Sequence, residues 1–144
     1  MVNPYFKKYQ QNYLQGEIET ASPEKILILL YDGAIQFLNK AKIALEQNNN
    51  TEIYNNLIGA QKILLEFMRT IDMEAVDNDL PQRLYSLYYY LYKTLVRANI
   101  EKSMDKVNEV LNHMVELRAT WKQAIAIAAK EGSLDNDGDE DNNE

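Results

Sequence analysis

Residues 22–47 read SPEKILILLYDGAIQFLNKAKIALEQ, and this stretch begins in the way a helix begins. Ser22 is a favoured N-cap residue, Pro23 follows where its missing N–H costs nothing, and Glu24 stands near the positive end of the helix dipole. The stretch stops in the polar run Asn48–Asn50. These residues predict a long first helix over this range.

Three further stretches repeat apolar residues at the helical spacing of three and four. The second helix is expected to follow Thr51 and to end near Ile71 or Met73. The third is expected to begin with Asp79 as its cap and Pro81 in its first turn, and the fourth follows Ser103. The repeated positions are Ile53, Leu57, Ala60, Leu64, Phe67, Met68 and Ile71, then Leu84, Leu87, Tyr88, Leu91, Leu95 and Ala98, and finally Met104, Val107, Leu111, Met114, Trp121, Ile125 and Ala128.

Four helices of similar length joined by short polar connections predict an all-α fold, an antiparallel four-helix bundle. The expected organisation is an N-terminal cap segment over residues 1–21, the bundle over 22–131 and an acidic tail over 132–144. The tail, GSLDNDGDEDNNE, has one apolar residue and a run of like charges. It cannot bury enough surface to offset its ordering entropy, so we expect it to be disordered.

The composition narrows the classes of function. The chain has no cysteine, which removes disulfides and thiolate chemistry and fits a cytoplasmic protein. The net charge of −7 arises in the tail, because 16 acidic and 15 basic residues remain once its six acidic residues are set aside. Such a body lacks the basic surface that a nucleic-acid partner requires. No apolar run has the length of a signal peptide or a membrane span, so neither secretion nor membrane insertion is expected.

Catalytic and metal sites find little support in the sequence. A di-metal bundle site needs Glu-x-x-His pairs, whereas the chain has one histidine, His113, preceded at that spacing by Val110. His113 falls on the polar side of the fourth helix, and a histidine phosphotransfer bundle is therefore the alternative from another class. Glu109 and Glu116 beside it would repel a phosphoryl group. We expect no enzyme activity, no metal and no cofactor.

Tyrosines supply the strongest functional signal, because the chain has ten of them. On the second helix, and again on the third, a second apolar stripe lies beside the core face. Two such stripes indicate an exposed apolar groove that binds an amphipathic helix, although stripes of this kind can also widen a core or serve a generic helical interaction module. The candidate groove residues are Tyr54, Ile58, Gln61 and Leu65 on the second helix and Tyr85, Tyr89, Tyr92 and Val96 on the third.

Two other features bear on this groove. Tyr5, Tyr9 and Tyr13 are spaced by four and would share a helical face with Phe6, which suggests a detachable cap. Gly33 interrupts the first helix at a cost of about 1 kcal/mol, which indicates close approach of either a neighbouring helix or a bound segment.

The chain resembles the flagellar secretion chaperone FliS family over roughly Tyr5 to Ala129. The likeness lies in a combination of motifs that is specific as a set, although each piece alone is weak. The motifs are Tyr9-Gln10-Gln11, Thr20-Ala21-Ser22-Pro23-Glu24-Lys25, Leu30-Tyr31-Asp32-Gly33-Ala34-Ile35, Gln61-Lys62-Ile63-Leu64, Leu84 to Tyr88, Ala98-Asn99, and Leu117-Arg118 with Trp121. The connection Asp72–Asp79 lacks the glycines of the family pattern, and the acidic tail is not part of that pattern.

The resemblance implies a cytoplasmic chaperone that binds the disordered C-terminal segment of flagellin and keeps it from polymerising early. It further implies delivery of flagellin to the flagellar type III export gate, without a cofactor or ATP, and it leaves room for a co-chaperone or regulator. In the family the ligand wraps around the bundle, and the N-terminal segment can cover apolar surface in the free protein.

Overall fold

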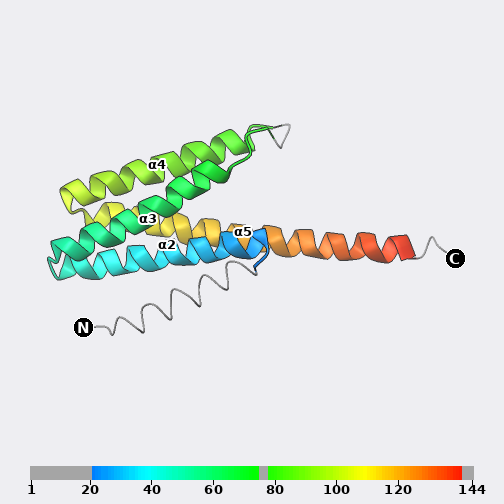
Figure 1. Cartoon of the computed structure of the whole chain (residues 1–144), viewed down its shortest axis with the longest axis horizontal. Helices are drawn as coiled ribbons and strands as arrows, with labels where there is room; N and C mark the ends of the chain where they lie inside the picture. The colour runs from blue at the N-terminus through cyan, green and yellow to red at the C-terminus, as the bar shows by residue number, and fades with distance from the viewer. Residues whose placement is uncertain (1–20, 75–77, 141–144) are drawn as a thin grey trace.

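A computed structural model describes residues 21–74 and 78–140, with side chains up to Ser133. Within these ranges the chain forms four helices and no strand: α2 (Pro23–Glu46), α3 (Asn50–Thr70), α4 (Leu80–Glu101) and α5 (Met104–Glu140). The helices pack in a ring, in which α2 and α4 each contact both α3 and α5 (Figure 1). The predicted all-α four-helix bundle is confirmed. The proposed cap residues Tyr5, Phe6, Tyr9 and Tyr13 lie outside the described residues.

The first helix begins as its sequence predicts. The Lys25 N–H donates to the Ser22 hydroxyl at 3.2 Å, and Pro23 occupies the first turn. The next helix begins before Thr51, because the Glu52 N–H donates to the Asn49 side chain at 3.2 Å and makes Asn49 the cap. An asparagine side chain caps a helix at least as well as threonine does.

Asp79 is the N-cap residue of α4, as expected, but its side chain makes no capping hydrogen bond. The Asp79 carboxylate accepts instead from Nε of Arg83, at 2.9 Å. The Leu80 N–H donates to the Asn78 side chain at 3.0 Å, so the neighbouring asparagine satisfies this free backbone group. Pro81 lies in the first turn as expected.

The core runs the length of the bundle and uses the predicted apolar faces, except that Ile125 and Ala128 of the predicted fourth-helix repeat lie outside it, half-buried and exposed on the later part of α5. Its buried apolar side chains are Tyr31, Ala34, Leu38, Ala41, Ala44, Ile53, Leu57, Ala60, Leu64, Phe67, Met68, Tyr88, Leu91, Leu95, Ala98, Val107, Val110, Leu111 and Met114. Leu84, Leu87 and Trp121 are partly buried and pack against this cluster. None of the helices within 21–74 and 78–140 is both long and apolar enough to cross a membrane.

Two glycines lie where α2 and α3 pack together. A Cβ atom added at Gly33 would lie 3.4 Å from Cδ1 of Ile63, at the short end of ordinary contact. A Cβ atom added at Gly59 would lie 2.7–2.8 Å from three ring carbons of Phe37, which is too close. The packing of α3 against α2 therefore leaves room for a Cβ atom at Gly33, whereas Gly59 marks a contact too close for one.

Alanine at these two positions is expected to change stability differently. Both substitutions gain about 1 kcal/mol of helix propensity, but only Gly59→Ala forces the Phe37 ring to move, at an overpacking cost of about 1–3 kcal/mol. Urea denaturation should therefore find Gly59→Ala less stable than Gly33→Ala by that cost. Equal free energies of unfolding in the two variants would show that the α2–α3 contact is looser than described.

The last helix is longer than the others and projects past the end of the bundle (Figure 1). The sequence predicts a disordered tail from Gly132, whereas the backbone of α5 continues as a helix to Glu140. Extending an existing helix adds one hydrogen bond for each residue ordered and avoids the cost of nucleation, which explains the difference. Residues 141–144 lie outside the described residues.

Candidate functional site

The predicted stripe on α3 lies beside α4. Gly59 and Ile63 mark the side of α3 that faces α2. At 3.6 residues per turn, Tyr54, Ile58 and Leu65 lie on the opposite side of the helix. Tyr54 is 54% exposed and Leu65 is 46% exposed, while Ile58 is half-buried.

The predicted stripe on α4 lies on the flank nearer α3. Tyr90 marks the side of α4 that faces α5, because its hydroxyl donates to the Glu109 carboxylate at 2.5 Å. The stripe lies on the other side of the helix, where Tyr85 and Tyr89 are 42% and 48% exposed and Tyr92 and Val96 are half-buried.

The two stripes therefore flank the contact between α3 and α4. We call this surface the α3–α4 face and define it by Tyr54, Ile58, Leu65, Tyr85, Tyr89, Tyr92 and Val96. Gln61, which the sequence groups with these residues, is only 6% exposed. Its side chain belongs to the interior and is not available on that face.

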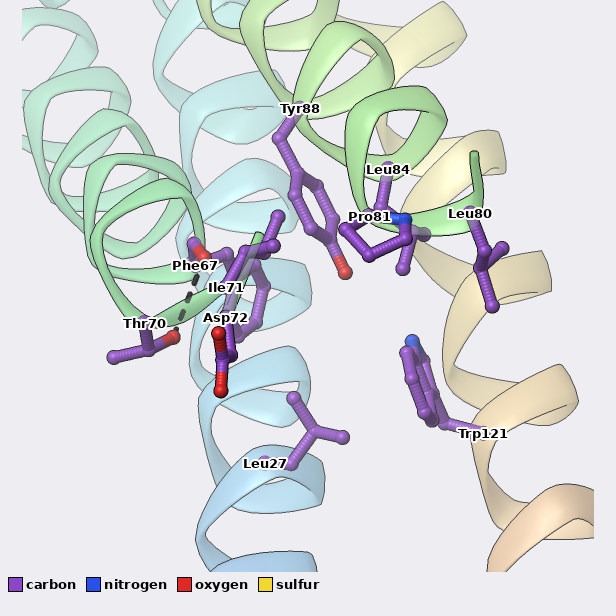
Figure 2. A pocket seen from close by; sticks show the side chains of 10 residues that line it. All are labelled: Leu27, Phe67, Thr70, Ile71, Asp72, Leu80, Pro81, Leu84, Tyr88 and Trp121. Atoms are coloured by element: carbon purple, nitrogen blue, oxygen red, sulfur yellow. Dashed lines mark hydrogen bonds between the residues drawn. The ribbon is translucent and has the colours of Figure 1, made fainter. Parts of the chain in front are cut away.

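A cavity of about 300 Å³ opens at the end of the bundle where α3 ends and α4 begins. We call it the aromatic cavity (Figure 2). All four helices or their ends contribute to its lining, which consists of Leu27, Phe67, Thr70, Ile71, Asp72, Leu80, Pro81, Leu84, Tyr88 and Trp121. The sequence places half of these in the apolar repeats of the predicted core faces, namely Phe67, Ile71, Leu84, Tyr88 and Trp121. The sequence does place several of the lining residues near helix ends, and an antiparallel bundle brings such ends together.

A second cavity, of about 630 Å³, lies between the start of α2 and the later part of α5. We call it the α2–α5 cavity. Its lining is Ser22, Glu24, Trp121, Ala124, Ile125, Ala128 and Ala129. Trp121 contributes to both cavities, so together they form a second apolar region, separate in sequence from the predicted stripes.

The rings of Phe67 and Tyr88 form the inner wall of the aromatic cavity, and the buried ring of Tyr31 packs behind them. The ring of Phe67 lies between those of Tyr31 and Tyr88, at centroid distances of 4.6 and 5.2 Å. The hydroxyls of the two tyrosines are hydrogen-bonded to each other at 2.6 Å. This bond joins α2 to α4 across the bundle, and Tyr31 is one of the residues that carried the family resemblance.

Burial raises the pKa of both tyrosines. For Tyr31 the loss of solvation has the largest effect, and the Tyr88 hydroxyl adds to the rise in pKa. For Tyr88 burial again dominates, while its hydrogen bond with Tyr31 and the nearby indole of Trp121 oppose the rise. Both hydroxyls therefore stay protonated at neutral pH, and neither tyrosine can act as a base there.

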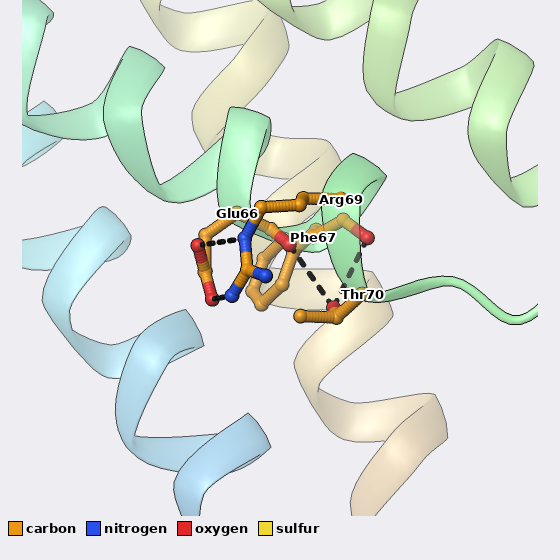
Figure 3. A network of polar contacts seen from close by, with 4 residues as sticks. All are labelled: Glu66, Phe67, Arg69 and Thr70. Atoms are coloured by element: carbon orange, nitrogen blue, oxygen red, sulfur yellow. Dashed lines mark hydrogen bonds and ion pairs between the residues drawn. The ribbon is translucent and has the colours of Figure 1, made fainter.

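A polar network stiffens the last turn of α3 beside the aromatic cavity (Figure 3). Arg69 donates from Nε to the Glu66 carboxylate at 3.0 Å, and the hydrogen bond holds the pKa of Glu66 below its usual value. The Thr70 hydroxyl donates to the main-chain carbonyls of Glu66 and Phe67, at 3.0 and 3.3 Å. These bonds position Thr70 and Phe67, which both line the cavity.

The remaining motif residues have structural positions. Asp32 accepts a hydrogen bond from Arg118, which ties α2 to α5, and Asn99 accepts one from Lys102 at 3.0 Å. Ala98 is buried in the core. His113, on which the phosphotransfer alternative depends, is half-buried on α5 and lines neither apolar cavity.

Comparison with known proteins identifies the family. The family model described as "Flagellar protein FliS" matches residues 5–128 of this chain. The chain belongs to the FliS family. The family match spans all of α2, α3 and α4 and most of α5, so the α3–α4 face and most of the lining of both cavities lie inside it.

Individual FliS relatives come from several bacteria. The flagellar secretion chaperone FliS of Bacillus subtilis (strain 168) is 33% identical over 129 residues, which cover 90% of this chain and 91% of the relative. The namesake in Campylobacter jejuni is 30% identical over 121 residues, covering 84% and 91%. The Escherichia coli (strain K12) protein is 28% identical over 117 residues, covering 81% and 86%. The likeness thus extends over nearly whole chains.

Proposed function

We propose that the protein is a cytoplasmic export chaperone for flagellin. It binds the disordered C-terminal segment of flagellin, prevents premature polymerisation and assists delivery to the flagellar type III export apparatus. The proposal starts from membership in a family of flagellar secretion chaperones. The observation that carries it furthest is the exposed apolar surface of the α3–α4 face.

That surface has the chemistry that an amphipathic segment requires. Its tyrosines offer large apolar rings with polar hydroxyls, and their two rotatable bonds limit the entropy lost on binding. The exposed apolar side chains lie on two neighbouring helices, which suits a helix that docks along them. A bound segment would cover these side chains and so shield from water the apolar surface that is exposed in the free protein.

The N-terminal segment, residues 1–21, acts in this proposal as a cap for the free chaperone. Its aromatic residues, Tyr5, Phe6, Tyr9 and Tyr13, are suited to cover apolar surface until flagellin displaces them. Ser22, which follows the segment directly, lines the α2–α5 cavity. The segment is therefore tethered beside apolar surface, at a high effective concentration.

Two substitutions on the α3–α4 face test where flagellin binds. Tyr89→Ala removes a half-exposed ring, and Ile58→Glu places a charge in the contact. Each is expected to weaken binding of a flagellin C-terminal peptide about 10- to 100-fold, as loss of an aromatic anchor or burial of an unpaired charge does. Calorimetric titration of each variant against the wild-type protein measures the change.

The matched control is Ile43→Glu, because Ile43 is 54% exposed on α2 and lies away from the α3–α4 face. It should bind the peptide as the wild type does. Circular dichroism should show unchanged helicity and melting temperature in Tyr89→Ala and Ile58→Glu. A large loss of stability would mean that these side chains support the core, and the binding site would then have to lie elsewhere.

A further inference from the structure

Within residues 21–74 and 78–140, the hydrogen-bonded pair of tyrosines leaves one hydroxyl hydrogen unused. Two hydroxyls carry two hydrogens, and the bond between Tyr31 and Tyr88 uses one of them. Among the hydrogen bonds of the described residues, neither hydroxyl donates to any other acceptor. The indole N–H of Trp121 is a donor only, so it cannot accept that hydrogen.

The unused hydrogen is available to the aromatic cavity. Tyr31 is fully buried behind the wall, whereas Tyr88 is 2% exposed and lines the cavity. In Figure 2 the Tyr88 hydroxyl and the Trp121 indole nitrogen both point into the space that the lining residues enclose. When Tyr31 donates to Tyr88, the Tyr88 hydroxyl can donate into the cavity, and the indole N–H of Trp121, which lies near both hydroxyls, is a second donor at the same place.

The walls and the rim narrow the chemistry of the ligand. Leu27, Ile71, Leu80 and Leu84 supply aliphatic surface, which favours a large apolar side chain. The carboxylate of Asp72 lies at the rim and disfavours an anion. The ligand that fits is therefore a neutral group that joins an apolar side chain to a carbonyl oxygen.

We propose that the aromatic cavity binds one large apolar residue of the flagellin segment, whose main-chain carbonyl accepts hydrogen bonds from Tyr88 and Trp121. This inference rests on the proposed function for the identity of the segment. A carbonyl oxygen has two lone pairs, so it can accept both of these bonds only if it has no hydrogen-bond partner inside its own helix. The residue therefore lies at the C-terminal end of a helical stretch of flagellin, or just beyond it.

A small probe tests the cavity without flagellin. Trp121 is the single tryptophan of the chain, so its indole N–H gives one resolved signal in a ¹H–¹⁵N NMR spectrum. N-acetyl-leucinamide combines the apolar side chain with neutral carbonyls and should shift that signal in a saturable way. N-acetyl-serinamide has the same carbonyls without the apolar side chain and should not. Absence of a saturable shift up to the solubility limit of the leucine probe would overturn the proposal.

Tyr88→Phe removes the donor hydroxyl and keeps the ring. It should weaken binding of N-acetyl-leucinamide about 3- to 10-fold, the effect of one lost hydrogen bond. Tyr90→Phe is the matched control, because it removes a hydroxyl from the same helix on the side that bonds Glu109. Equal affinities for Tyr88→Phe and Tyr90→Phe would contradict the assigned role of Tyr88.

Trp121→Phe gives an independent test should Tyr88→Phe fold poorly. It removes the other donor, and it should weaken binding of the flagellin peptide in a calorimetric titration by a similar factor, about 3- to 10-fold. Unchanged binding of the peptide by Trp121→Phe would reject the cavity as the binding site and leave the proposed function intact. No binding of the peptide by the wild type, together with a saturable shift from N-acetyl-leucinamide, would reject flagellin as the ligand and keep the cavity.

Discussion

Phe67→Ala lowers the free energy of unfolding by about 3–5 kcal/mol, the range found when a buried aromatic ring is removed from a core. The ring is 3% exposed and packs against both Tyr31 and Tyr88. Its removal joins a new void to the aromatic cavity and leaves the hydrogen-bonded tyrosines without the ring between them. A domain of this size has about 5–15 kcal/mol in total, so the variant retains a fraction of its stability.

Chemical denaturation followed by circular dichroism measures this loss. Tyr89→Ala serves as its control, because that ring is half-exposed and its removal should change the free energy of unfolding by no more than about 0.5 kcal/mol. A loss below about 1 kcal/mol for Phe67→Ala would mean that the three aromatic rings are not packed against one another.

The second large effect is a fall in stability at alkaline pH. In the unfolded chain a tyrosine loses its proton near pH 10, whereas the raised pKa values of Tyr31 and Tyr88 keep both protonated to higher pH in the folded protein. Above pH 10 the unfolded state therefore binds fewer protons than the folded state. The free energy of unfolding then falls by up to about 1.4 kcal/mol per pH unit for each of the two tyrosines, and it is unaffected by them well below that pH.

The double variant Tyr31→Phe/Tyr88→Phe isolates this contribution. All other ionisable side chains are common to both proteins, so the difference in slope belongs to the buried pair. The variant should show a shallower fall in stability between pH 10 and 12. At neutral pH it should be less destabilised than either single variant, each of which leaves a buried hydroxyl without a partner at a cost of about 1–3 kcal/mol. Identical slopes would mean that the pair is accessible to solvent.

Local sequence signals predict most of the bundle. Ser22 and Pro23 specify the start of α2, and the spacing of residues such as Leu57, Leu64 and Leu91 identifies the core faces, because both depend on neighbours along one helix. The cap of α3 is less well defined, since Asn49 and Thr51 are both acceptable caps and the chain geometry decides between them. The length of α5 is also poorly predicted, because composition describes the tail without the helix that precedes it.

Part of the candidate site can likewise be predicted from the sequence of single helices, and part depends on tertiary packing. The exposed tyrosines of the α3–α4 face are predicted, because exposure follows from angular position on one helix. Gln61 is predicted to lie on the same face but is buried, because its exposure depends on how closely α4 approaches α3. The aromatic cavity is not predicted, since Leu27, Phe67, Pro81 and Trp121 come from four helices and meet only through tertiary packing. The pairing of Tyr31 with Tyr88 joins residues 57 positions apart, a distance that helical periodicity does not reach.

The central claim is that this FliS-family chain holds the C-terminal segment of flagellin, and isothermal titration calorimetry tests it most directly. The full chain should bind a flagellin C-terminal peptide one to one, with a dissociation constant of about 1 µM or tighter. The heat of binding should become more favourable as temperature rises, because burial of apolar surface gives a negative heat-capacity change. No binding heat at any temperature with about 100 µM peptide would contradict the account.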